Sequence, residues 1–261
     1  MLTAVAWALL PLSAAGQTAP NRAARYLFQT DVQDGRAVWV NPAGTAVTPS
    51  ASIYGDVTAR GPGDTTRLAQ ITAGFSSRGL SFAYQYDDFD SGKGHTYRLG
   101  LAGSSGALSV GAAAAYYRGD AKAWGYDVAA LYRAAPAVTL GATVANIGEP
   151  VVRGARQVLA FTPGATVTPL GPALQVSVQG RFAESSDAYG AGVRWRLPLT
   201  LPVALGARLD TDGDLRRTGF VFVMVIGDRD QVGLVVTTPR DLSTIEGSSI
   251  HGVAARPMGA R

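Results

Sequence analysis

The sequence predicts an all-β protein: an antiparallel transmembrane β-barrel of about 14 strands, with 12 as the lower bound. Segments of about ten residues alternate between apolar and polar side chains, which is the length a tilted strand needs to cross a bilayer. Hydrophobic residues make up 47 % of the chain and charged residues only 16 %, yet no continuous apolar run is long enough for a membrane helix. A barrel explains this combination, because its lipid-facing and lumen-facing side chains interleave.

The segment Gly79–Asp87 shows the alternation most clearly, with Leu, Phe, Tyr and Tyr on one face and Ser, Ala, Gln and Asp on the other. The same pattern predicts thirteen strands, at 50–59, 68–76, 79–88, 94–103, 106–118, 122–133, 136–146, 155–167, 172–184, 187–197, 200–210, 215–227 and 230–238. Single-chain bacterial barrels have an even number of strands. Ser248–Arg256 is therefore the candidate for a fourteenth, although its alternation is poor and the chain does not end on an aromatic residue. Either a tail extends past the barrel or the sequence is a piece of a longer protein.

The N-terminus predicts an export signal over residues 1–15. An apolar stretch, Leu2–Leu12, leads to the small-residue triplet Ser13-Ala14-Ala15, which suits cleavage before Gly16. A short buried helix is the alternative, and the missing basic residues leave open a start further upstream. The predicted organisation is then an N-terminal periplasmic or lumenal segment over 16–49, the barrel over 50–256 and a tail over 257–261.

Connection lengths predict the orientation. The connections after even-numbered strands are short, such as Ser77-Arg78 and Ala134-Ala135, whereas several after odd-numbered strands are longer, such as Asp88–Gly94. Bacterial barrels keep short turns on the periplasmic side, so the first strand is expected to start in the periplasm, with the N-terminus there too. An aromatic girdle near the external loops agrees with this and comprises Tyr84, Tyr86, Tyr97, Tyr116, Tyr117, Trp124, Tyr126, Phe182 and Tyr189.

The sequence predicts neither an enzyme nor a cofactor or metal site. It has no cysteine and two histidines, of which His95 shares the lipid-side register of Tyr97. Asp210–Asp214 resembles a calcium loop but has Val221 where such a loop needs glutamate, so it is interpreted as an external turn. The net charge of +4 is spread along the chain and does not indicate a nucleic-acid partner.

Arginines in the inward register are the most distinctive lumen feature. They face the carboxylates of Asp87, Asp127 and Asp210, and they could brace a narrow barrel or hold an anionic ligand. The candidate ligand or lumen-lining residues are Arg98, Asp127, Arg181, Arg194, Arg196 and Arg208, with Arg133 in the same register.

Two short motifs resemble the FadL-like outer-membrane superfamily, which includes long-chain fatty-acid transporters and the PorV and PorQ proteins of type IX secretion. Asn41-Pro42-Ala43-Gly44 lies in Ala37–Ala46 ahead of the first strand, and Asn146-Ile147-Gly148 closes the seventh. The resemblance implies 14 strands and an N-terminal segment that plugs the lumen, carried by Trp39, Asn41, Pro42 and Gly44. We expect Trp39 to pack against the twelfth strand, where Phe220–Ile226 is apolar on both faces. An ordinary periplasmic turn is the alternative for this segment.

These expectations place the chain in the outer membrane of a Gram-negative bacterium, surrounded by outer-membrane lipid. There it would bind or transport a hydrophobic or anionic small molecule. The first alternative is a scaffold for a secretion or envelope complex, with an envelope protein as partner, although short loops count against a partner platform. The second is the membrane domain of a larger protein, for example one fused to a peptidase.

Overall fold

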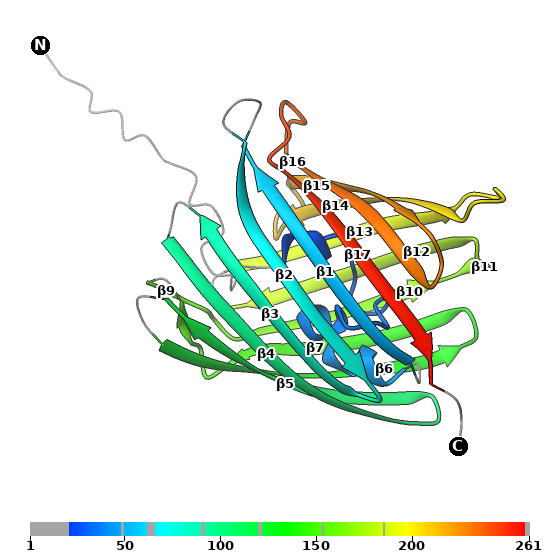
Figure 1. The fold of residues 1–261 in the computed structure, drawn as a ribbon, viewed down its shortest axis with the longest axis horizontal. Coiled ribbons are helices and arrows are strands. Elements are labelled where there is room, and N and C mark those ends of the chain that lie inside the picture. The colour runs from blue at the N-terminus through cyan, green and yellow to red at the C-terminus, as the bar shows by residue number, and fades with distance from the viewer. Residues whose placement is uncertain are drawn as a thin grey trace, which may run out of the picture.

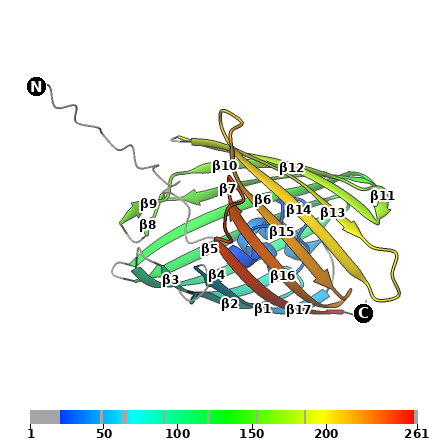
Figure 2. The same cartoon turned by 90° about the horizontal axis from the view of Figure 1, so that it is seen from above.

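The computed structural model describes residues 21–47, 50–61, 66–89, 92–119, 122–152, 154–184 and 186–258. They form a closed barrel of antiparallel strands around a short N-terminal stretch (Figures 1 and 2). The fourteen barrel strands are β1 (Ser50–Arg60), β2 (Arg67–Ser77), β3 (Leu80–Phe89), β4 (Gly92–Ser105), β5 (Leu108–Arg118), β6 (Lys122–Ala135), β7 (Val138–Ile147), β10 (Ala160–Val167), β12 (Leu174–Ala183), β13 (Ser186–Arg196), β14 (Val203–Asp212), β15 (Arg217–Ile226), β16 (Asp230–Pro239) and β17 (Gly247–Pro257). The predicted signal peptide lies outside the described residues.

Strand β17 closes the barrel against β1, in a continuous register from Ser50 opposite Pro257 to Arg60 opposite Gly247. The predicted fourteenth strand is therefore confirmed, together with the predicted barrel. Its alternation is weak in the sequence because serine and glycine occupy both of its faces. The inward Ser249 is buried, while the outward Gly252 lies opposite Gly55 of β1.

The predicted strand at 155–167 is divided in the structure. Residues 151–156 form a separate two-stranded hairpin of β8 (Val151–Val152) and β9 (Ala155–Arg156), and barrel pairing with β7 begins only at Ala160. Similarly, β11 (Pro169–Pro172) lies in the turn before β12. The hairpin consists of Val, Ala and Arg at its strand positions, and periodicity alone cannot assign such short runs to the barrel wall or to a connection.

Exposure alternates along the strands in the sense opposite to that of a soluble barrel. In β1, the apolar Ile53 is 65 % exposed, whereas Asp56 is 4 % exposed and points inward. Apolar side chains are exposed in the same way around the ring, including Leu99, Val128, Val178, Met224 and Ile250. Exposed apolar surface of this extent marks a membrane-facing wall.

None of the helices among the described residues is long and apolar enough to cross a membrane.

Aromatic side chains cluster on the outward face of β3 to β6, as expected from the aromatic girdle predicted from the sequence. The ring centroids of Tyr97 and Tyr116 lie 6.2 Å apart, and those of Tyr116 and Trp124 lie 4.8 Å apart. The assignment of Tyr117 to this girdle is wrong, because its side chain shares the inward register of Ala113 and Ala115 and is 5 % exposed. In a strand, adjacent residues face opposite sides, so only one of two consecutive tyrosines can face lipid.

Residues 21–47, here called the lumenal segment, lie inside the ring of strands (Figure 1). They contain η1 (Arg22–Ala24), α1 (Ala37–Val40) and η2 (Pro42–Ala46). At one end, Arg22 N–H donates to the Gln70 side chain at 2.8 Å. At the other, the Thr45 hydroxyl donates to the carbonyl of Gly79, in the turn between β2 and β3. The segment therefore runs the length of the lumen.

The described part of this segment begins at the end of the barrel opposite the start of β1, whereas the predicted N-terminus at Gly16 lies outside the described residues. If β1 starts in the periplasm, Ser50 marks the periplasmic end and Arg60 the external end. Asn21 donates to Asp56 at 3.2 Å, and Arg22 lies beside Gly247, the partner of Arg60. Residue 21 is thus at the end opposite the start of β1, because the chain crosses the lumen before it enters the wall.

A charge on the outward face tests the membrane-facing wall. Leu99, near the middle of β4, is 52 % exposed. We expect Leu99→Arg to destabilise the folded barrel in lipid vesicles by roughly 2–4 kcal/mol, because the charge enters the hydrocarbon layer. Ser105→Arg is the matched control, on the same face at the strand end, where the cost falls to about 0–1 kcal/mol. Equal effects of both variants in urea titrations would contradict a membrane-spanning β4.

Candidate functional site: the occupied lumen

The first half of the lumenal segment packs against the wall formed by β15 and β16. Its apolar residues form one buried cluster with inward valines of these strands: Ala24, Tyr26, Leu27, Val32 and Ala37 with Val221, Val223, Val225 and Val235. Strand β15 is apolar on both faces for this reason. One face contacts lipid and the other contacts the lumenal segment, as the sequence predicted for something packed inside the barrel.

The second half packs against the other side of the lumen. Val38 and Trp39 contact a cluster that contains Tyr54, Ala83, Ala113 and Val253. The expectation that Trp39 packs against the twelfth strand, β15, is therefore wrong. Side chains advance by about 100° per residue in a helix, so Ala37 and Trp39 of α1 point to nearly opposite walls, and Ala37 takes the contact with β15.

Polar contacts also hold Trp39. Its indole Nε1 donates to the Tyr54 hydroxyl at 2.5 Å, and the Arg98 guanidinium lies 5.3 Å from the ring centroid. A cation over an indole face is favourable when both are desolvated, and Arg98 is 7 % exposed. Trp39 thus connects the lumenal segment to both β1 and β4.

Asn41, Pro42 and Gly44 fix the turn from α1 into η2. The Asn41 side chain accepts from Ala43 N–H at 3.0 Å and donates to the carbonyls of Gln29 at 2.9 Å and Ala130 at 3.3 Å. It therefore caps η2 and also binds the wall at β6, while Pro42 takes the first helical position, where no donor is needed. A Cβ on Gly44 would lie 2.2 Å from the carbonyl oxygen of Val32, so only glycine fits there.

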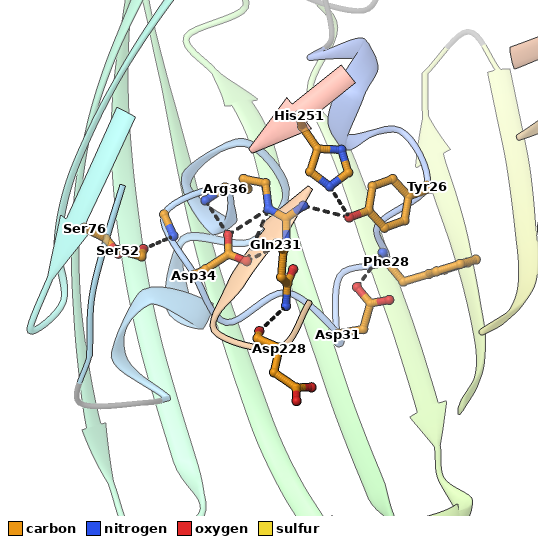
Figure 3. Close-up of polar contacts among 11 residues, drawn as sticks. Tyr26, Phe28, Asp31, Asp34, Arg36, Ser52, Ser76, Asp228, Gln231 and His251 are labelled. Carbon is orange, nitrogen blue, oxygen red and sulfur yellow. Dashed lines mark hydrogen bonds and ion pairs between the residues drawn. The ribbon is translucent and has the colours of Figure 1, made fainter. Parts of the chain in front are cut away.

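A buried polar cluster joins the lumenal segment to β17 (Figure 3). Arg36 pairs with Asp34 at 2.6 Å and donates to the Tyr26 hydroxyl at 2.7 Å, and this hydroxyl lies 3.5 Å from Nε2 of His251. Burial alone would raise the pKa of Asp34, but the charge and hydrogen bonds of Arg36 hold that pKa below its usual value. Burial raises the pKa of Tyr26. The ion pair therefore persists at neutral pH beside a neutral phenol. No sequence pattern marks this cluster, because the segment lacks periodicity.

Three of the inward arginines predicted to line the lumen have buried or partly buried partners inside the barrel. Arg98 forms a buried ion pair with Asp127, and Arg208 pairs with Asp210 at 2.7 Å and donates to the carbonyl of Leu27 at 2.8 Å. Arg194 donates to Gln175, which in turn donates to Asp31 of the lumenal segment. These three side chains therefore brace the wall and hold the lumenal segment in place.

The remaining arginines lie closer to the rims. Arg196 pairs with Asp228 at 2.7 Å, with both side chains about half exposed. Arg181 is partly buried, and Arg133 is exposed. Neither Arg181 nor Arg133 has a hydrogen-bond or ion-pair partner among the described residues. The six arginines therefore do not converge on one ligand site in this structure.

A small cavity remains between the lumenal segment and the wall of β12 to β15. It measures about 20 Å³ and is lined by side chains that include Tyr26, Asp31, Gln175, Arg194 and Arg208. That volume holds about one water molecule. Within the described ranges, no group of three or more histidine or acidic side chains could hold a metal ion.

Glycines on the inward face make room for the lumenal segment. A Cβ on Gly111 would lie 2.6 Å from the backbone nitrogen of Ala43, and one on Gly192 would lie 2.7 Å from the Phe28 ring. Contacts this short cannot persist, so a side chain at either position displaces the segment.

Two solved structures share the architecture over almost the whole chain. The toluene transporter TbuX of Ralstonia pickettii superposes with a TM-score of 0.60 at 11 % identity, over 92 % of this chain and 97 % of the other. The toluene transporter TodX of Pseudomonas putida gives a TM-score of 0.54 at 11 % identity, over the same shares. This chain has the fold of these transporters. No family model matches the sequence, and no curated protein matches it.

The structural likeness agrees with the resemblance derived from Asn41–Gly44 and Asn146–Gly148, at the level of the fold. Together with the exposed apolar wall, it identifies the chain as a closed β-barrel with a membrane-facing outer surface.

Substituting one inward glycine tests the fit of the lumenal segment. We expect Gly111→Ala to loosen residues 42–46, because the new methyl group meets their backbone. Trypsin should then cleave near Arg36 faster in the folded protein. Gly103→Ala is the control, because a Cβ at that position on β4 meets nothing within 4 Å. Unchanged cleavage of Gly111→Ala would contradict the packing described here.

Proposed function

We propose that the protein transports a neutral hydrophobic small molecule across the outer membrane and that the lumenal segment keeps the barrel closed until a substrate passes. This proposal takes the hydrophobic rather than the anionic substrate class. The observation that carries it is the occupation of the lumen by residues 21–47, from the Gln70 contact to the Gly79 contact, inside a transporter-type barrel.

The pairing of the inward arginines favours a neutral substrate. An anion site needs guanidinium groups free to bind a carboxylate or phosphate. Arg98 and Arg208 instead have ion partners within the wall, and Arg98 also lies against the ring of Trp39. Removing these groups from their partners to bind an anion would leave buried carboxylates uncompensated.

The contacts of the lumenal segment with the wall suit a segment that closes the lumen and can also shift within it. Apolar residues of its first half pack on β15 through Val221 and Val223, while its contact with β10 includes a single hydrogen bond between Thr30 and Thr166 at 2.6 Å. Such a segment excludes water and ions when docked. The docked segment leaves space for only about one water molecule on the β12–β15 side, which is too small for a substrate. A substrate could therefore pass there only if the segment shifted along the wall.

Uptake into proteoliposomes tests the substrate class. We expect the full chain to accelerate entry of toluene, a neutral probe, but not of octanoate, its anionic counterpart. Arg181→Ala removes an inward arginine with no described partner, and it should change toluene entry by less than about twofold. Octanoate entry that depends on Arg181 would overturn the assignment of a neutral substrate. If the protein accelerated the entry of neither probe, the proposal of transport itself would fail.

A further inference from the structure

The outward face of β3 to β6 carries two parallel rows of side chains. Cross-strand register places Tyr84, Tyr97, Tyr116 and Trp124 side by side in the first row. The second row, two residues nearer to the Arg60 end of the barrel, consists of Tyr86, His95, Arg118 and Lys122. Directly paired residues point to the same face, so the second row faces outward as the first does.

The second row is basic on the side of β5 and β6. Arg118 lies opposite Lys122, and both side chains are exposed. Lys93, two residues from His95 on the same face, adds a third cation and pairs with Asp88 at 3.2 Å. Neither Arg118 nor Lys122 has a hydrogen-bond or ion-pair partner in the part of the chain that the structure describes. Two neighbouring cations are thus left facing out of the barrel wall.

The position of these cations relative to the membrane decides what they meet. Aromatic rings mark the boundary between hydrocarbon and headgroups. Two residues along a strand advance by about 7 Å, which takes Arg118 and Lys122 from the level of Tyr116 and Trp124 into the headgroup layer. Because Arg118 is at the same end of the barrel as Arg60, this is the external leaflet in the predicted orientation.

The outward face of β12 and β13 at the same level carries the opposite charge. On the outward face of β12 and β13, Phe182 lies directly opposite Asp187 and diagonally from Tyr189, whose ring it meets edge to face at 6.0 Å. The exposed carboxylates here are those of Asp187, beside Phe182, and of Glu184, two residues further along the chain. A general rim of cations would surround the whole barrel, whereas here basic and acidic sectors differ.

We propose that Arg118, Lys122 and Lys93 form a binding site for the phosphate groups of an outer-leaflet glycolipid. The phosphorylated sugar headgroup would lie against the cations, and its acyl chains would descend along the aromatic row and the apolar wall below it. Clustered cations at the membrane surface bind anionic headgroups, each contributing separately. The site is on the lipid face and does not depend on transport through the lumen.

Lipid titration of the purified full chain in neutral detergent tests the site. The probes are diphosphoryl lipid A, the same glycolipid without phosphates, phosphatidylglycerol and inorganic phosphate. We expect the diphosphoryl form to bind most tightly, and the double variant Arg118→Ala with Lys122→Ala to bind it about tenfold more weakly or worse. Arg216→Ala with Arg240→Ala is the matched control, because it removes two exposed cations elsewhere at the same end. This control should change binding by less than about twofold.

Each other outcome overturns the proposal. Equal binding of the dephosphorylated glycolipid would exclude phosphate recognition, and equal loss in both double variants would indicate a nonspecific charge effect. Preference for phosphatidylglycerol that depends on Arg118 would place the site in the inner leaflet, and inorganic phosphate bound as tightly would make it a free-anion site. Heat modifiability on gels shows that each variant is folded, and Lys122→Gln, a single exposed change, replaces the double variant if that one fails to insert.

Discussion

Deletion of residues 16–46 is expected to turn a barrel with little steady conductance into one with large, stable channels in planar bilayers. In the intact protein the lumenal segment contacts both sides of the wall, through Val223 on one side and Tyr54 on the other. A closed barrel of 14 strands has room for a channel once this segment is absent. The open channel should prefer anions, because Arg133, Arg181 and Arg194 remain on its inner face without a carboxylate partner among the described wall residues.

Two results would contradict this expectation. Large, stable conductance of the intact chain would mean that the lumenal segment leaves an open pore. An unchanged, low conductance of the deletion variant, in protein shown by heat modifiability to be folded, would mean that something other than residues 21–47 closes the barrel. The intact chain purified in the same detergent is the reference for both recordings.

The buried ion pair of Arg98 and Asp127 gives the second large effect. Asp127 accepts from Arg98 and also from the backbone N–H of Asn146 at 2.9 Å, and both paired side chains are about one-tenth exposed. Removing one partner leaves a buried charge uncompensated, so Asp127→Leu should lower the free energy of unfolding by roughly 3–5 kcal/mol. The double variant Arg98→Met with Asp127→Leu should recover most of this loss, because no charge then remains buried.

Urea titration of folding into lipid vesicles measures both variants. Asp228→Leu is the matched control, since it breaks the half-exposed pair with Arg196 and should have a small effect. If Asp127→Leu were as mild as the control, the pair would not be desolvated as the structure shows. If the double variant were as unstable as the single one, the loss would come from the Asn146 contact instead.

The barrel was predictable because the period of a strand is visible in sequence. Alternation such as Leu80 to Asp87 determines both the strand and the face of each side chain. Even the weak last strand, Ser248–Arg256, followed from the need for an even count. The hairpin at 151–156 was not separable from β10, because short runs of Val, Ala and Arg have no distinguishing period.

The contents of the lumen were predictable only in part. The apolar inner face of β15 indicated that something packs inside, and the resemblance at Asn41–Gly44 indicated which segment. The partners were not predictable, because a segment without periodicity does not encode its direction across the lumen. Trp39 was therefore assigned to the wrong wall, and the cluster of Tyr26, Arg36 and His251 was not anticipated.

The central claim, that the lumenal segment must move for a substrate to pass, can be tested by locking the segment to the wall. The chain has no cysteine, and the hydroxyls of Thr30 and Thr166 lie 2.6 Å apart. In the variant Thr30→Cys with Thr166→Cys, toluene uptake into proteoliposomes is measured with the disulfide formed and again after reduction. We predict that the disulfide lowers uptake at least about tenfold and that reduction restores it, with each single-cysteine variant unaffected. Equal uptake with the disulfide formed and reduced would contradict the claim.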